Sequence, residues 1–375
     1  MKKYLILFVM LLFSATIITS AQGDLPSVAD LSDGWNTIET GGFCSAGTPY
    51  QFYASPNENS DNLLIFFNGG GACWFGQACD LESEPNIHVP FADMGHNVVA
   101  ETQTGIFNLD NEDNPFADYD MVFVPYCTGD VHVGAGEREY TYTNADNEEV
   151  TVTVYHNGYE NSTTVLNWVY ENFDSPENIV VAGSSAGAIG SSFYSGLIAE
   201  NYADVPVTLI ADGAGGYGSP NLARVFIAWD TASILPDWDE YAGQSNETLT
   251  FEDFYIASAK HNDNLTLAQY NTAEDETQIG FTMVLGDAPD SFTLPQRLFN
   301  NYLQIESAVD DFYAYTAGGS FHTILRFPVF YSYEVEGVRF VDWVASLIQG
   351  DAIDDISCVN EVIGCSTAPD EAMDG

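Results

Sequence analysis

The sequence predicts an α/β fold in which a mostly parallel central sheet is flanked by helices. Short apolar, β-branched runs alternate along the chain with segments of helical periodicity. Each apolar run ends in a polar or glycine-rich loop, which is typical of parallel strands covered by helices on both faces. One run, within residues 177–190, leads directly into Gly-x-Ser-x-Gly. That order of strand, tight turn and helix is the signature of a nucleophile elbow.

The expected strands and helices follow one another in a regular order. We expect a strand at 63–67, a strand at 119–124, a helix at 161–173, a strand at 179–182, a helix that runs to Ala199 and a strand at 207–211. The first strand is followed by Asn68-Gly-Gly-Gly-Ala-Cys73, and the last ends at Asp212. Active sites of such proteins lie at the carboxyl ends of the strands, so these loops are the candidates for chemistry.

Three regions depart from this alternation. Residues 139–143 and 150–155 alternate in polarity around a polar turn, which predicts a β-hairpin that leaves the main fold. Residues 220–300 are less regular and rich in aromatic and acidic residues, and we expect helices and loops there that build a cap or groove wall. Two strands are predicted within 327–340, followed by a helix at 341–348.

The first 21 residues are predicted to be a secretory signal peptide that is cleaved after Ala21. A basic start, Met1-Lys-Lys3, precedes an apolar run at 4–18 and small residues. That run is short for a membrane span, and no later run is long enough to cross a bilayer. Residues 22–375 are expected to form one exported domain, because no linker or repeat divides them.

The chain is strongly acidic, with 55 Asp and Glu against 8 Lys and Arg and a formal net charge of −47. This charge excludes nucleic acid as a partner and disfavours anionic membranes and polyanionic polymers. A disordered acidic protein is also excluded, because 46% of the residues are hydrophobic and 14% are aromatic. The oligomeric state stays open.

Six cysteines predict disulfides rather than a metal site. An even number in an exported chain is typical of disulfide pairing. Two pairs are close in sequence and elimination leaves the third, so the expected pairs are Cys73–Cys79, Cys358–Cys365 and Cys44–Cys127. No Cys-x-x-Cys and no grouping of Cys and His at zinc spacing occurs, and we expect no metal and no cofactor.

Ser185, at the centre of Gly-x-Ser-x-Gly, is the candidate nucleophile. A serine hydroxyl needs a neutral imidazole to take its proton and a carboxylate to orient that imidazole. In the α/β-hydrolase arrangement the histidine follows the serine, which leaves His261 and His322. His322 lies in a loop of small residues before a predicted strand at 324–330 and is the preferred base. His261 lies among polar residues, and His132 precedes the serine and breaks the order.

The carboxylate partner is not decided by spacing. Asp212 ends the strand after the elbow, and Asp275 lies in a polar segment further along. Aspartates are numerous in this chain, and most are expected to be solvated. Spacing alone leaves Asp212 and Asp275 tied.

The glycine-rich loop after the first strand is the candidate oxyanion hole. Its backbone N–H groups, together with that of Ala186 after the nucleophile, offer two or three donors to a tetrahedral oxyanion. An ordinary glycine turn is the alternative. A phosphate-binding loop is not supported, because Gly-x-x-x-x-Gly-Lys-Ser/Thr is absent.

Four motifs together resemble the pectin acetylesterase / Notum carboxylesterase family. They are Gly69-Gly-Gly-Ala-Cys-Trp74 with Cys79, Pro125-Tyr-Cys-Thr-Gly-Asp-Val131, Gly183-Ser-Ser-Ala-Gly187, and Asp275-x-x-Gln278. The resemblance extends from about Trp35 to Ile348, and the chain looks like a bacterial-type member. It implies an α/β-hydrolase-like fold and a serine carboxylesterase.

The resemblance also implies roles for single residues. It makes Ser185 the nucleophile and His322 the base, and it favours Asp275 as the acid because the Asp-x-x-Gln pattern recurs there. The oxyanion donors it implies are the N–H groups of Gly70, Gly71 and Ala186. One departure is that the family's tryptophan beside the cysteine of this loop is replaced, with Trp74 displaced past Cys73, which leaves the acyl length open.

The sequence therefore predicts a secreted serine esterase that acts on O-acyl esters, most simply an O-acetyl ester on a polysaccharide. Pectin itself is disfavoured because a strongly anionic enzyme repels polygalacturonate, so a neutral acetylated glycan or a small acyl ester fits better. One alternative is a lipid, polyester or long-acyl esterase, which a long apolar pocket would favour. Another is a catalytically inactive glycan-binding module that uses residues 220–300.

Overall fold

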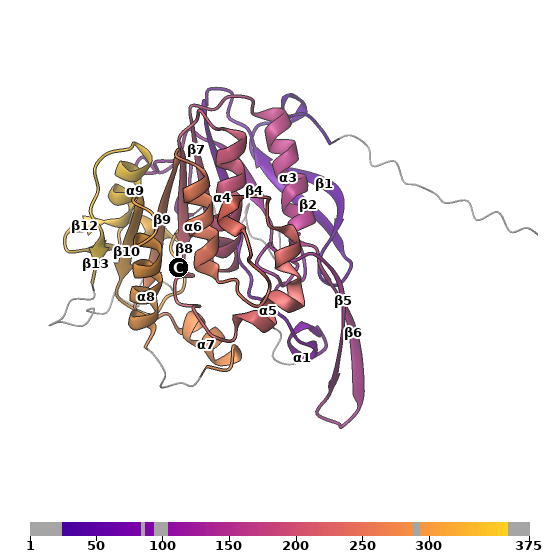
Figure 1. Cartoon of the computed structure of the whole chain (residues 1–375). Coiled ribbons are helices and arrows are strands. Elements are labelled where there is room, and N and C mark those ends of the chain that lie inside the picture. Colours follow the sequence, from indigo (N-terminus) through magenta and orange to yellow (C-terminus); the bar gives the residue numbers. More distant parts are fainter. Residues whose placement is uncertain (1–24, 84–86, 94–103, 288–292, 359–375) are drawn as a thin grey trace, which may run out of the picture.

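The computed structural model of the chain describes residues 25–83, 87–93, 104–287 and 293–358 (Figure 1). The predicted signal peptide and Cys365, the expected partner of Cys358, lie outside these residues. The described chain is built around one large sheet with helices on both sides of it, and a two-stranded ribbon projects from one end (Figure 1).

Nine strands form the central sheet within the described residues, in the order β1-β2-β4-β3-β7-β8-β9-β10-β13. Neighbours from β4 to β13 are parallel, whereas β1 and β2 pair antiparallel with each other and β2 pairs antiparallel with β4. The prediction of a mostly parallel sheet is confirmed. The strands are β1 (Asn36–Phe43), β2 (Pro49–Ser55), β3 (Asn62–Phe67), β4 (Asp120–Val124), β7 (Asn178–Ser184), β8 (Val207–Asp212), β9 (Leu265–Thr272), β10 (Phe312–Ala317) and β13 (Ile356–Ser357).

Two apolar cores, one on each face of the sheet, explain why central strands such as β3 and β7 are apolar throughout. In β3, Ile65 and Phe67 pack in one core, and Leu64 and Phe66 pack in the other. Consecutive side chains of a strand point to opposite faces, so a strand buried on both faces is an unbroken apolar run. The first core includes side chains of α3 (Gly158–Asn172), α4 (Ala186–Asn201), α6 (Phe251–His261) and α8 (Leu294–Glu306), and the second those of α9 (Phe340–Ile348) and the 3₁₀ turn η2 (Gly105–Phe107).

Residues 220–300 match the predicted cap only in part. Helices α5 (Leu222–Trp229) and α7 (Glu276–Val284) lie at one end of the sheet (Figure 1), with the 3₁₀ turns η3 (Thr231–Ile234) and η4 (Asp239–Tyr241) between α5 and α6. The same stretch contains β9, a strand of the central sheet, so the expectation of helices and loops alone was wrong. Its buried Gln269 and Asn271 hide the apolar pattern, and the Gln269 amide donates to Asn301 Oδ1 at 3.0 Å.

The strand predicted at 324–330 after His322 is also wrong. The chain turns there and enters a 3₁₀ turn, η5 (Pro328–Tyr331). The N–H groups of Ile324 and Leu325 donate to the carboxylate of Asp212 and are not available to a sheet ladder. The predicted pair of strands within 327–340 is reduced to β11 (Glu334–Val335) and β12 (Val338–Arg339), which pair antiparallel.

The predicted hairpin is confirmed as β5 (Gly136–Thr143) and β6 (Glu149–His156), the ribbon that projects at the lower right of Figure 1. Short helix α1 (Gly76–Cys79) lies near its base (Figure 1), and a further 3₁₀ turn, η1 (Val28–Asp30), lies near the start of the described chain. Cys73 and Cys79 form the predicted disulfide, and so do Cys44 and Cys127.

Candidate active site

Ser185 occupies a sharp turn between β7 and α4. Its φ of 56° and ψ of −123° lie in a region that non-glycine residues rarely adopt, as expected of a serine that a nucleophile elbow holds out of the sheet. The turn depends on close backbone approach, because a Cβ on Gly187 would lie 2.0 Å from the carbonyl oxygen of Phe67. Glycine at position 187 therefore allows α4 to pack directly on the end of β3.

Ser185, His322 and Asp275 are brought together although they are far apart in sequence. His322 Nε2 lies 2.7 Å from Ser185 Oγ, and His322 Nδ1 lies 2.7 Å from Asp275 Oδ2. The carboxylate of Asp275 is fully buried, whereas 22% of the His322 side chain is exposed. An imidazole that contacts a hydroxyl on one side and a carboxylate on the other can take a proton from that hydroxyl.

The Asp275 carboxylate is held by the first turn of α7. Asp275 is the N-cap of this helix, and its Oδ1 accepts the backbone N–H of Gln278 at 2.9 Å. The side-chain amide of Gln278 donates to Oδ2 at 3.0 Å. Gln278 is itself fixed, since its Oε1 accepts the N–H of Gly216 at 2.7 Å. The Asp-x-x-Gln spacing thus gives the carboxylate one orientation toward His322.

Asp212, which spacing left tied with Asp275, does not contact the His322 ring through a hydrogen bond. Its buried carboxylate accepts the hydroxyl of Ser184 at 2.8 Å and the backbone N–H groups of Ile324 and Leu325 at 3.0 Å. Burial raises the pKa of Asp212 to about 6, against the lowering effect of these donors. The structure therefore separates the two aspartates by their partners.

The two histidines that the sequence offered as alternatives to His322 lie in different surroundings. His261 ends α6, stacks on Trp238 and contacts Glu240 Oε2 at 3.2 Å. His132 is buried, and its Nε2 lies 2.9 Å from the carbonyl oxygen of Asn68. Burial lowers the pKa of His132 to about 4, so its imidazole is neutral at pH 7. Its contact with the Asn68 carbonyl lies at the end of β3, where the glycine loop begins.

The glycine loop lies beside Ser185. Gly71 has a φ of 77°, and a Cβ there would lie 1.9 Å from the carbonyl oxygen of Ile87, so only glycine fits. The neighbouring backbone is paired with this segment, through Ala72 N–H to Ile87 O at 3.0 Å and Val89 N–H to Gly70 O at 2.8 Å. Within the described residues, the N–H groups of Gly70, Gly71 and Ala186 have no hydrogen-bond acceptor.

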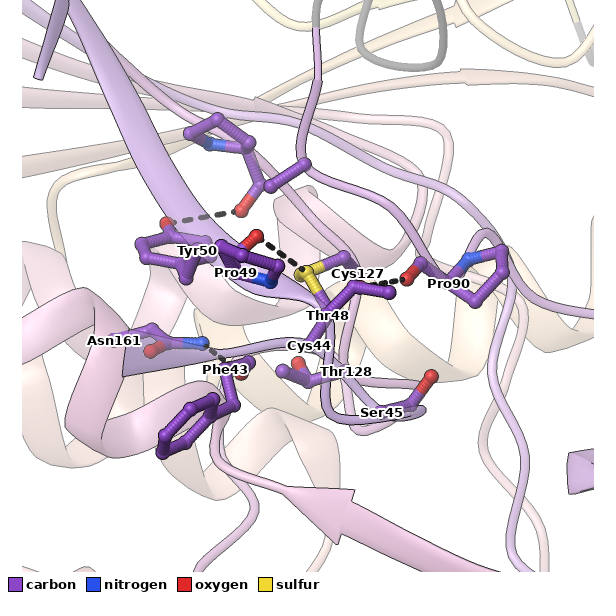
Figure 2. The surroundings of a disulfide bond; sticks show 12 residues. Phe43, Cys44, Ser45, Thr48, Pro49, Tyr50, Pro90, Cys127, Thr128 and Asn161 are labelled. Atoms are coloured by element: carbon purple, nitrogen blue, oxygen red, sulfur yellow. Dashed lines mark hydrogen bonds between the residues drawn. A yellow bond between two sulfur atoms is a disulfide. The ribbon is translucent and has the colours of Figure 1, made fainter. Parts of the chain in front are cut away.

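Both disulfides cross-link the segments on which the glycine loop packs. Cys73 is joined to Cys79, and its N–H donates to the carbonyl of Gly129 at 2.8 Å. The segment that contains Gly129 is tied in turn by Cys127 to Cys44, at the turn after β1 (Figure 2). The cross-links restrict the loop that follows β3, which favours a preformed set of N–H donors.

An apolar pocket opens next to Ser185. Its walls are Gly71, Ala72, Trp74, Val131, Ser185, Ala186, Ile189, Tyr217, Leu222, Val225, Trp229, Phe251, Phe281 and Leu285. The free volume of this pocket is only about 40 Å³. Trp74, although displaced in sequence, does line this pocket. Most of the other lining residues come from α4, α5, α6 and α7, and sequence reasoning missed them because apolar side chains carry no signal that separates a pocket wall from a core.

A second, more open groove adjoins the glycine loop. Gly71 and Phe281 line both the pocket and this groove, and the remaining walls are Gly70, Ile87, His88, Val89, Thr277, Gly280 and Val284. Its free volume is about 570 Å³. Among the described residues, no Asp, Glu, Lys or Arg lines either hollow. Burial lowers the pKa of His88 to about 4, so this wall is uncharged at neutral pH.

The one grouping of potential metal ligands in the described ranges is Cys73, Cys79 and His156. Its two sulfurs are bonded to each other, so they cannot act as thiolate ligands. None of the helices in the described ranges has the length and hydropathy that a bilayer span requires.

Comparison with known proteins relates this site to a family of esterases. The sequence model of the pectinacetylesterase family matches residues 15–217. Palmitoleoyl-protein carboxylesterase notum1a of Danio rerio is 30% identical over 155 residues, which are 39% of this chain and 27% of the relative. Palmitoleoyl-protein carboxylesterase NOTUM of Mus musculus is 28% identical over 187 residues, 47% of this chain and 34% of the relative. An inactive palmitoleoyl-protein carboxylesterase, notum1b of Danio rerio, is 32% identical over 93 residues, 24% of this chain and 66% of the relative. The match thus spans between about a quarter and a third of the length of the first two relatives.

Proposed function

Since this chain belongs to the pectinacetylesterase family, we propose that it is a secreted serine carboxylesterase that hydrolyses short O-acyl esters. The observation that carries the proposal is the continuous hydrogen-bonded line from Ser185 Oγ through the His322 imidazole to Asp275 Oδ2, with both contacts at 2.7 Å. It joins a nucleophile, a base and an acid, and these residues follow one another along the chain as nucleophile, acid and histidine, the order of α/β-hydrolases.

The first half of the reaction acylates the enzyme. Ser185 Oγ attacks the ester carbonyl carbon while His322 Nε2 takes the hydroxyl proton. Asp275 accepts the Nδ1–H bond and stabilises the imidazolium that forms. Collapse of the tetrahedral intermediate breaks the bond to the alcohol oxygen, and His322 returns the proton to that leaving alcohol.

The N–H groups of Gly70, Gly71 and Ala186 stabilise the oxyanion of that intermediate. They have no other acceptor among the described residues, so they keep their hydrogen-bonding capacity for the substrate. Removing one such donor in other hydrolases costs about 3–4 kcal/mol of transition-state stabilisation. Deacylation repeats the sequence with water, from which His322 takes a proton as the water attacks the acyl carbon.

The pocket beside Ser185 favours a short acyl group. A free volume of about 40 Å³ corresponds to roughly three water-sized groups. An acetyl or slightly longer chain fits there, whereas the palmitoleoyl group in the relatives' names is far too long for the pocket in this conformation. The large side chains that line it are Trp74, Tyr217, Trp229, Phe251 and Phe281.

The open groove that shares Gly71 and Phe281 with the pocket is the place for the alcohol portion of the ester. Among the described residues, its walls carry no ionised side chain, so an uncharged alcohol enters it without an unpaired charge. A net charge of −47 adds long-range repulsion of anionic polymers. We therefore expect an O-acetylated neutral glycan, or a small neutral ester, as the substrate class.

The proposal is tested by hydrolysis of p-nitrophenyl esters from acetate to decanoate and of acetylated neutral and anionic glycans. Wild-type protein should prefer acetate, and Ser185→Ala should be inactive. Ser195→Ala is the matched control, because Ser195 is buried in α4 and its hydroxyl donates to the Ser192 carbonyl at 3.1 Å, away from the pocket lining. A wild-type rate equal to that of Ser185→Ala would contradict the esterase function, and the alternative of an inactive glycan-binding module would remain. A preference for decanoate would instead favour a long-acyl esterase.

A further inference from the structure

Asp212 lies where three parts of the candidate active site meet. It ends β8, and its backbone carbonyl accepts the N–H of Ser185 at 2.7 Å. Its side chain is fully buried and accepts the hydroxyl of Ser184, the residue before the nucleophile, at 2.8 Å. One residue thus contacts both the nucleophile's backbone and the strand that carries it.

The same carboxylate holds the chain that follows His322. The N–H of Ile324 donates to both carboxylate oxygens, at 3.1 and 3.0 Å, and the N–H of Leu325 donates to Oδ2 at 3.0 Å. On the other side of His322, the carbonyl of Phe321 accepts the hydroxyl of Thr272 at 2.7 Å. The backbone on either side of the imidazole is therefore anchored, and Asp212 supplies the anchor on the carboxyl side.

The next residue extends this connection to the glycine loop. Arg326 Nη1 donates at 2.8 Å to Oδ1 of Asn68, the residue that precedes Gly69. Asn68 N–H is itself paired with the Val124 carbonyl at 3.0 Å. The positive charge of Arg326 is near enough to Asp212 that the carboxylate raises the pKa of the guanidinium, against the stronger lowering by burial.

The backbone at the end of β8 packs closely against the chain that carries His322. Gly213, which follows Asp212, has a φ of 81°, and a Cβ there would lie 2.4 Å from the carbonyl oxygen of His322. The chain that carries the imidazole therefore rests directly on the backbone at the end of β8. The buried N–H groups of Ile324 and Leu325 in this loop need hydrogen-bond acceptors, and Asp212 provides them.

We propose that Asp212 is a positioning residue that holds the His322 loop and the nucleophile strand in register, while Asp275 alone orients the imidazole ring. This role rests on the proposed function. Three donors on an ionised carboxylate are charge-assisted, and stronger than neutral hydrogen bonds. Since catalysis requires Ser185 Oγ and His322 Nε2 at hydrogen-bond distance, loosening this junction lowers the rate of the chemical step more than substrate binding.

The test compares Asp212→Asn with Asp120→Asn. Asp120 is a matched control, because it is a half-buried aspartate at the opposite end of a strand, and its Oδ1 accepts a backbone N–H, that of Asn57, at 2.8 Å. With p-nitrophenyl acetate, Asp212→Asn should lower kcat roughly 100-fold with little change in KM, as for a displacement of about 1 Å in a reacting group. Asp120→Asn should leave both constants near the wild-type values. Equal kcat values in the two variants would overturn the proposal.

A second readout does not depend on turnover. The proton between His322 Nδ1 and Asp275 Oδ2 should give a low-field NMR resonance that His322→Ala abolishes. Asp120→Asn should keep this resonance, and Asp212→Asn should shift or broaden it. An unchanged resonance in folded Asp212→Asn would contradict the proposal even if the wild-type protein proved inactive, which would separately reject the proposed function.

Ser184→Ala covers the case in which Asp212→Asn fails to fold. It removes one donor to the carboxylate and leaves the bonds from Ile324 and Leu325 in place. The expected fall in kcat is smaller, roughly tenfold at most. Wild-type kcat and an unshifted His322 resonance in Ser184→Ala would then overturn the proposal.

Discussion

Lowering the pH from 7 to 5 is predicted to destabilise the folded protein, because buried histidines outweigh buried aspartates. Burial lowers the pKa of His88 and His132 to about 4 and that of His156 to about 3, from the ordinary 6.5. A group with a lowered pKa in the folded state contributes stability that is present above pH 6.5 and is lost as the pH falls through the folded pKa. At pH 5 the unfolded histidines are protonated and the folded ones are not, which costs about 2 kcal/mol each.

The aspartates act in the opposite direction but are weaker. Burial raises the pKa of Asp130 and Asp212 to about 6 from 3.8. A raised pKa makes the stability contribution largest below pH 3.8 and removes it as the pH rises through 6. On going from pH 7 to 5 each carboxyl therefore regains about 1.3 kcal/mol. Three histidines lose about 6 kcal/mol and these two aspartates regain about 3, which leaves a net loss of about 3 kcal/mol. Burial also raises the pKa of Asp120, Asp253 and Glu306, which reduces this loss further, so about 3 kcal/mol is the upper value.

Urea denaturation at the two pH values, in 0.5 M NaCl, measures this difference. The salt shortens the Debye length to about 4 Å and screens the repulsion among surface carboxylates, whose relief at low pH would otherwise mask the loss. We expect the free energy of unfolding to be lower at pH 5, by up to about 3 kcal/mol. An equal or higher free energy at pH 5 in high salt would refute the burial of these histidines in the neutral form.

Three further predictions concern the site itself. Asp275→Asn should lower kcat about 10⁴-fold with little change in KM, because the amide favours the wrong imidazole tautomer. Stopped-flow hydrolysis of p-nitrophenyl acetate measures both constants. A fall in kcat of less than tenfold would contradict the role of Asp275 as the acid of the triad. Phe251→Ala and Phe254→Ala should both destabilise the protein by about 3–5 kcal/mol, since both side chains belong to α6 and are buried. Only Phe251 lines the pocket, so only Phe251→Ala should raise the rate of hydrolysis of the hexanoate ester relative to the acetate ester. A shift of equal size in Phe254→Ala would contradict the assigned pocket. Replacing Cys73 and Cys79 together by serine should lower kcat by about 10-fold or more, because the glycine loop loses its cross-link. An unchanged kcat in the folded variant would show that the loop is preformed without this disulfide.

Four of the nine strands described in the sheet, β3, β4, β7 and β8, could be predicted, because they are apolar on both faces. Strands such as β3 and β7 meet two cores, and the run of β-branched and aromatic residues that this requires is visible in the sequence. β9 was missed because buried Gln269 and Asn271 interrupt that run, and their polarity is satisfied by contacts such as the one with Asn301. Such a contact depends on a helix 32 positions away and leaves no local pattern.

Two parts of the site differ in how much the sequence reveals. Ser185 and the glycine loop are recognisable because turn geometry requires glycine at fixed positions, as at Gly71 and Gly187. The acid is not recognisable from spacing, because Asp212 and Asp275 both follow strands and only the fold decides which one reaches the imidazole. The strand predicted after His322 failed for the same reason, since the N–H groups that would have formed it donate to Asp212.

The most direct test of the central claim is covalent labelling of Ser185. Incubation of the purified protein with a p-nitrophenyl phosphonate, followed by intact-mass and peptide mass spectrometry, should give one adduct on the peptide that contains Ser185. The adduct should be absent from Ser185→Ala and form slowly in His322→Ala, because the imidazole activates the hydroxyl. No adduct, or an adduct on another residue that persists in Ser185→Ala, would contradict Ser185 as the nucleophile.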